Sequence, residues 1–140
     1  MKASSNPKLL ISIFIAFGIM FFVGCGKSAT EEGIQLNDGE KWKVNAEMTP
    51  HITEAEAIFE DYMEKDRTDY LVLADQLKEK NTKLIRSCTM EGESHEELHK
   101  WLHPHLGLVA DLSKAEDEIS SLEQLEKLEA SFKLYRQYFE

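Results

Sequence analysis

The stretch YLVLADQLKEKNTKLIRSC, residues 70–88, decides the fold class. Its apolar residues recur every three, four or seven positions, which is the period of one face of an α-helix. Asn81 is the polar interruption of this face, and such an asparagine usually sets register or binds water. We predict a helix that starts near Thr68 or Asp69 and buries this face, which comprises Tyr70, Leu73, Leu77, Leu84 and Cys88.

The helical period continues on both sides of this stretch. Thr49 as N-cap and Pro50 in the first turn predict an earlier helix. A third helix is expected from about Glu93, with a kink where Pro104 removes a backbone hydrogen bond, and a fourth from residues 113–117. The expected core faces are Ile52, Ala55, Phe59 and Tyr62; Leu98, Leu102, Val109 and Leu112; and Leu122, Leu125, Phe132, Tyr135 and Phe139.

Four amphipathic helices with short connections predict an all-α, up-down-up-down four-helix bundle over residues 48–140. Residues 25–47 have no helical period and are expected to form a flexible tether. Within it, Asn37-Asp38-Gly39 separates two short alternating runs, which is a hairpin pattern. Because a lone two-stranded ribbon is only marginally stable, we expect Trp42 and Val44 to pack on the helical body instead.

Residues 1–24 have the features of a secretory leader. Two lysines precede an uncharged apolar run, residues 9–23, which is too short to favour a spanning helix. The run ends at Phe22-Val23-Gly24-Cys25, a small residue followed by cysteine, and this resembles the lipobox of bacterial lipoproteins. The resemblance implies that Cys25 is acylated and becomes the first mature residue. An ordinary signal peptide with a chance cysteine is the alternative.

The resemblance to lipoproteins also implies a location. Such a protein is held at a membrane by its lipid and lies outside the cytoplasm. The lipobox-like run departs from the usual pattern of this class at Phe22, where leucine is usual. Gly26 is not the aspartate that retains lipoproteins in the inner membrane, so the outer membrane is expected in a cell with two membranes.

The chain is strongly acidic, with 26 acidic and 16 basic residues and a formal net charge of −10. Phosphate backbones repel such a chain, so nucleic acid is not expected as a partner, and no feature of the sequence identifies a protein partner. With Cys25 acylated, Cys88 has no intrachain disulfide partner. Its thiol is therefore expected to be buried, metal-bound or paired with another chain.

Metal-binding side chains gather between residues 88 and 105. Thiolate, thioether and imidazole suit copper and zinc better than calcium or magnesium. In an up-down bundle the start of the first helix meets the end of the second and the start of the third, which adds Met48 and His51 to this group. We expect a copper or zinc site formed by Cys88, Met90, His95 and His99, with His51 or Met48 as a further ligand.

The remaining two histidines of this stretch are set apart from the expected site. His103 lies two turns beyond His95 on the flank of the third helix and is expected to face outward. His105 falls within the apolar stripe, roughly 15 Å along the axis from His95 at 1.5 Å per residue. The Cys-x-Met pair favours Cu(I), although Zn(II) remains open.

Two readings without this metal site stay open. In one, Cys88 is a small core residue, Met90 fills a gap and the histidines solvate the third helix, so that the bundle is a structural or protein-interaction module. In the other, haem lies between helices. The chain has no C-x-x-C-H motif for covalent attachment of haem, so this second alternative is the less expected one.

The run His95-Glu96-Glu97-Leu98-His99 fits H-E-x-x-H, the zinc-peptidase signature. Leu102 stands where the longer pattern of that class needs glycine to turn the chain back toward a third histidine at position 105. Zinc peptidases of this type also bind substrate along a sheet edge, and the sequence offers no run of strands. We therefore expect no enzyme activity.

Two segments resemble parts of small secreted helical lipoproteins of bacteria. One is LNDGEKWKVN, residues 36–45, and the other runs from Cys88 through Leu98-His99 and Trp101-Leu102 to Pro104. This resemblance implies a secreted helical protein and no particular activity.

Overall fold

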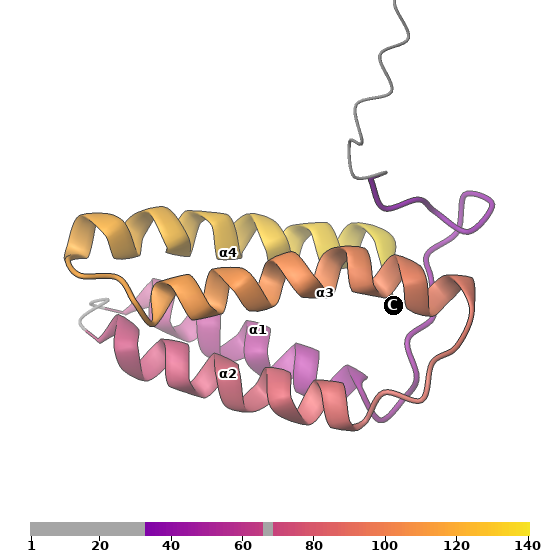
Figure 1. The fold of residues 1–140 in the computed structure, drawn as a ribbon, viewed down its shortest axis with the longest axis horizontal. Coiled ribbons are helices and arrows are strands. Elements are labelled where there is room, and N and C mark those ends of the chain that lie inside the picture. Colours follow the sequence, from indigo (N-terminus) through magenta and orange to yellow (C-terminus); the bar gives the residue numbers. More distant parts are fainter. Residues whose placement is uncertain (1–32, 66–68) are drawn as a thin grey trace, which may run out of the picture. The chain divides into compact units, whose positions relative to one another are not determined.

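The computed structural model describes residues 33–65 and 69–140. Four helices, α1 (Thr49–Glu64), α2 (Tyr70–Arg86), α3 (Glu93–Leu112) and α4 (Glu118–Tyr138), run alternately in opposite directions (Figure 1). The all-α, up-down-up-down bundle is confirmed. The leader, residues 1–24, and the lipidation site Cys25 lie outside the described residues. Within the described ranges, no helix combines the length and apolar character needed to cross a membrane.

Local signals in the sequence set the helix ends. The side chain of Asp69 accepts a hydrogen bond from the backbone N–H of Val72 and caps α2, which begins close to the predicted start. Asp117 and Ser120 form a reciprocal capping box at the start of α4. The cap of α1 is Met48 rather than the predicted Thr49, and it makes no side-chain hydrogen bond, since a methionine thioether is only a weak acceptor. Pro50 lies in the first turn, as predicted.

The core consists of two groups of buried side chains. The first, called here the end cluster, lies where α1 and α3 begin and where α2 and α4 end; it contains Trp42, Val44, Met48, Ile52, Leu84, Leu98, Trp101, Leu102, Tyr135 and Phe139. The second cluster lies toward the opposite end and includes Phe59, Leu73, Leu77, Val109 and Phe132. Leu122 was expected in the core and is 38% exposed instead, because Ser121 and Leu125 take the inward positions of α4.

Residues 34–45, called here the strap, are fixed to the bundle at several points rather than forming a flexible tether. Asp38 and Gly39 have φ angles of 52° and 92°, and Asn37 pairs with Glu40 around them, which is the backbone of a tight type I′ turn. In the described part of the chain, the antiparallel pairing of this hairpin is limited to Asn37 and Glu40. Trp42 is 8% exposed and packs in the end cluster, as expected. The packed unit therefore begins well before position 48.

The strap pairs with the end of α4. The backbone N–H of Trp42 donates to the carbonyl of Tyr138 at 2.8 Å, and Glu140 N–H donates to the Trp42 carbonyl at 2.9 Å. Val44 N–H donates to the Glu140 carbonyl at 2.8 Å, which completes a short parallel pairing around Phe139. The pairing gives a partner to the carbonyl of Tyr138, which the end of α4 would otherwise leave without a hydrogen bond.

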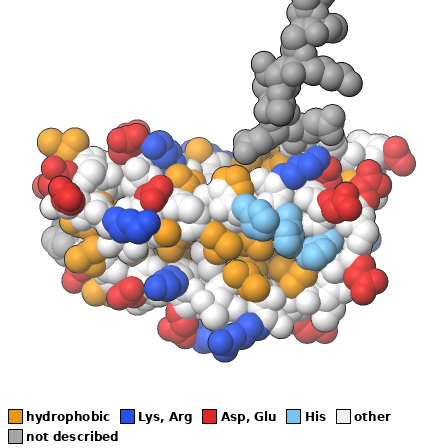
Figure 2. Space-filling view, in the orientation of Figure 1, with side chains coloured by type: hydrophobic (Ala, Val, Ile, Leu, Met, Phe, Trp, Pro, Cys, Tyr) orange, Lys and Arg blue, Asp and Glu red, His pale blue; other side chains and the backbone are white. Residues whose placement is uncertain are grey.

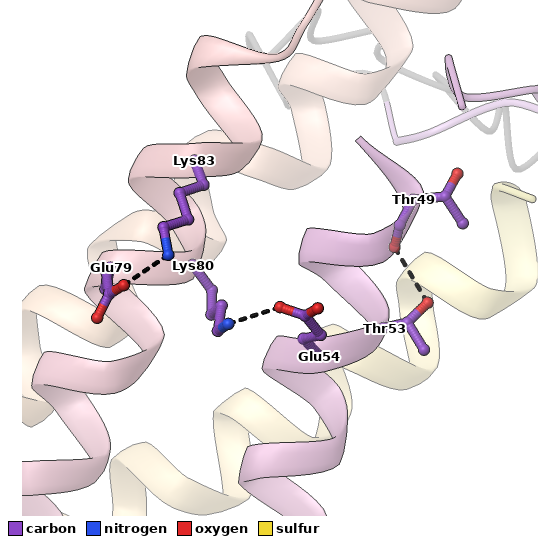
Figure 3. Close-up of polar contacts among 6 residues, drawn as sticks. All are labelled: Thr49, Thr53, Glu54, Glu79, Lys80 and Lys83. Carbon is purple, nitrogen blue, oxygen red and sulfur yellow. Dashed lines mark hydrogen bonds and ion pairs between the residues drawn. The ribbon is translucent and has the colours of Figure 1, made fainter. Parts of the chain in front are cut away.

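Ion pairs on the surface lie both between α1 and α2 and along α2. Nζ of Lys80 donates to Oε2 of Glu54 across the two helices at 2.5 Å, and Lys83 donates to Glu79 along α2 at 2.7 Å (Figure 3). Exposed ion pairs such as these are screened by solvent and add little stability. The bundle is therefore held mainly by its two apolar clusters.

Candidate metal site on helix α3

Three histidines form a row on the surface of α3. His95, His99 and His103 are spaced by four residues, which places them on one face of the helix at successive turns. The ring centroids of His95 and His99 are 4.3 Å apart, and those of His99 and His103 are 4.7 Å apart. Figure 2 shows histidine side chains as a continuous patch beside exposed hydrophobic ones. We call these three residues the histidine ladder.

The ladder is accessible to solvent along its length. His95 and His99 are half-buried, and His103 is exposed. The pKa of His99 is lowered mainly by partial burial and, to a smaller extent, by electrostatic repulsion from His95 and His103. Both effects favour the neutral imidazole, which is the form that binds metal ions.

The structure adds a contact to the expected position of His103. Its side chain faces outward, as predicted, but its ring contacts His99 and belongs to the same row. The signal was present in the sequence, since position 103 follows 99 by the same four residues that separate 99 from 95. Judging His103 only by its distance from His95 missed that relation.

The sulfur ligands occupy more enclosed positions. Cys88 and Met90 are half-buried in the connection between α2 and α3, and both pack against the end cluster. Met48 has no exposed surface and is a core residue, so its thioether is not accessible as a ligand. His51 lies in the first turn of α1, where its Nδ1 is buried and has no hydrogen-bond partner among the described residues.

The larger ligand set is not assembled around one point. Among residues 33–65 and 69–140, no three Cys, His, Asp or Glu side chains lie close enough together to hold a metal ion. The residues that the structure does bring together are the neighbouring pairs of the histidine ladder. A site that added Cys88 or His51 to a pair of these histidines would require side chains or backbone to move.

His105 is a core residue. It has no exposed surface, stacks on Trp101 with ring centroids 4.8 Å apart, and meets the ring of Phe132 edge-on. Its Nδ1 lies 2.9 Å from Oγ of Ser131, and burial lowers its pKa to about 4. The prediction that His105 falls within the apolar stripe is confirmed, and it is not available as the third ligand of a peptidase site.

The two glutamates of the H-E-x-x-H run have different environments. Glu96 is exposed, whereas Glu97 is buried, accepts a hydrogen bond from the backbone N–H of Gln35 at 2.8 Å and pairs with Lys100 at 2.6 Å. Glu97 thus fixes the strap onto α3. No local feature of the sequence predicts this role, because only a contact with a distant segment explains the burial of Glu97.

No protein-family model, curated protein or solved structure matches this chain. The function is therefore inferred from the chemistry of the ladder and from the sequence of the leader.

Proposed function

We propose that this protein is a membrane-anchored, extracytoplasmic lipoprotein whose helical domain binds copper or zinc through His95 and His99. The observation that carries the proposal is the separation of 4.3 Å between the two imidazole ring centroids on successive turns of α3. Two histidines four residues apart on a helix are a recurrent way to hold zinc, with metal–nitrogen bonds of about 2.0–2.1 Å. Small rotations of the two rings would direct one nitrogen of each toward a shared ion.

The ion would keep open coordination positions. Two imidazoles supply half of a tetrahedral shell, and water or an incoming ligand completes it. Cys88 and Met90 remain candidates for that completion because residues 87–92 are not helical and connect α2 to the start of α3. The membrane anchor rests on the lipobox-like run before Cys25.

We expect His99→Ala to weaken the binding of Cu(II) and Zn(II) to the detergent-solubilised full chain by roughly tenfold or more, since one imidazole alone loses the chelate. His51→Ala is the matched control, and its affinity should equal that of the wild type. Competition titration with a chromogenic chelator measures both. If the wild type binds no tighter than His99→Ala, no metal site exists on this face of α3.

The reading without metal has one observation in its favour: Cys88 and Met90 both pack against the end cluster. In that case Cys88→Ser lowers the free energy of unfolding, and no histidine substitution changes metal affinity. Measuring denaturant midpoints and metal affinities on the same variants separates the two functions.

The lipid anchor has its own expected result. The native protein should begin at Cys25 and carry acyl chains, and Cys25→Ala should remain unprocessed by the lipoprotein peptidase. Mass spectrometry of the N-terminal peptide, with the tryptic peptide of residues 28–41 as internal reference, measures both. An unmodified protein released into the medium would contradict the proposed anchor.

A further inference from the structure

We infer that the histidine ladder contains two overlapping chelating pairs, His95–His99 and His99–His103, which share His99. The ladder holds one divalent ion, which occupies one pair or the other. This inference rests on the proposed metal-binding function and adds a second binding position and a further ligand. The two pairs are alike in the feature that matters. Each spans one turn of α3, and the ring centroids are 4.3 Å apart in one pair and 4.7 Å apart in the other.

The three imidazoles do not form one three-ligand site. His95 and His103 are eight residues apart, which is about 12 Å along the helix axis at 1.5 Å per residue. Metal–nitrogen bonds of about 2.0–2.1 Å cannot bridge that separation. This agrees with the finding that, in the described part of the chain, no three Cys, His, Asp or Glu side chains surround a common point.

The ladder also cannot hold two ions at once. A neutral imidazole has one nitrogen lone pair for a metal, because its other nitrogen carries the proton. His99 therefore serves one pair at a time. Two divalent ions on adjacent turns would in addition repel each other strongly.

The ligand chemistry selects the ion. Both pairs consist of imidazole alone, and imidazole suits Cu(II) and Zn(II), whereas Cu(I) prefers thiolate and thioether. For equal geometry, divalent copper binds such nitrogen ligands more tightly than zinc. The ladder is therefore a Cu(II) or Zn(II) site, in contrast to the Cu(I) preference that the Cys-x-Met pair suggested.

Because the two pairs share His99, substitution of the three histidines should have unequal effects on metal affinity. Removing either outer histidine leaves one intact pair, so the overall association constant falls by only about twofold. Removing His99 destroys both pairs and should lower it by roughly tenfold or more. The double variant His95→Ala/His103→Ala also destroys both pairs and should match His99→Ala.

The test titrates the solubilised full chain with Cu(II) chloride, and separately with Zn(II) chloride, against a competing chelator. The variants are His95→Ala, His103→Ala, His99→Ala and the double variant; His99→Gln is a second central variant, and far-UV circular dichroism checks each fold. We expect one ion per wild-type chain, two nitrogen ligands in the Cu(II) electron paramagnetic resonance spectrum, and the unequal pattern above.

Three results would overturn the inference. If His95→Ala is as damaging as His99→Ala while His103→Ala is silent, a single pair binds the ion and the proposed function still holds. If the wild type binds two ions on the ladder, His99 does not restrict it to one pair at a time. If the wild type binds none, both the inference and the proposed function are wrong.

Discussion

Trp101→Ala should lower the free energy of unfolding by about 3–5 kcal/mol, the usual range for removing a large aromatic side chain from a core. Trp101 is 2% exposed, and its ring packs on His105 and Tyr135 with centroids 4.8 Å away in both cases. Its Nε1–H also donates to the carbonyl of Ser131 at 2.9 Å, which ties α3 to α4. The substitution removes the packing and the hydrogen bond together. Urea unfolding followed by circular dichroism measures the loss.

The matched control is Ile119→Ala on α4. Ile119 is 79% exposed, so its truncation should change the free energy of unfolding by less than about 0.5 kcal/mol. If Trp101→Ala costs no more than Ile119→Ala, the end cluster does not hold α3 against α4 as described.

His105 should make the stability of the bundle depend on pH. Burial lowers its pKa from 6.5 to about 4 in the folded chain, so between these values the unfolded chain binds a proton that the folded chain does not. The contribution is fully present above pH 6.5 and is lost as the pH falls toward 4. The total loss across that window is about 3 kcal/mol.

The experiment compares wild type with His105→Gln, because carboxyl groups titrate in the same window and affect both proteins alike. Glutamine removes the titration and keeps a side chain that can bond to Ser131. At pH 7 the variant should be less stable than the wild type, and the gap should narrow steadily as the pH falls to 4. A gap that is constant from pH 7 to pH 4 would show that His105 does not titrate in unfolding.

The bundle could be predicted because its helices follow local rules. Leu73, Leu77 and Leu84 repeat with the helical period, and Asp69 lies immediately before that pattern; all four have the predicted roles. Leu122 fits the same period and is exposed. Periodicity gives the width of an apolar face, and only packing decides which residues at its margin are covered.

Contacts between distant segments could not be predicted. The sequence marks Trp42 as a residue that should be buried, but nothing local indicates that its backbone pairs with Tyr138 and Glu140. The predicted set of metal ligands shows the same limit. Topology correctly placed Cys88 and His95 at one end of the bundle. The end of a four-helix bundle is roughly 20 Å across, since neighbouring helix axes lie about 8–10 Å apart, whereas a ligand set requires atoms within a few ångströms.

The pairing of the strap with α4 has a consequence for the order of folding. It joins residues near the two ends of the described chain, so closing this loop first would cost roughly 2–3 kcal/mol more chain entropy than closing the short connection between α1 and α2 or between α3 and α4. The helical hairpins can form from neighbouring segments before this loop closes. Trp42 and Phe139 would then dock late, as the step that locks a preformed bundle, and unfolding would begin where folding ends, with release of the strap.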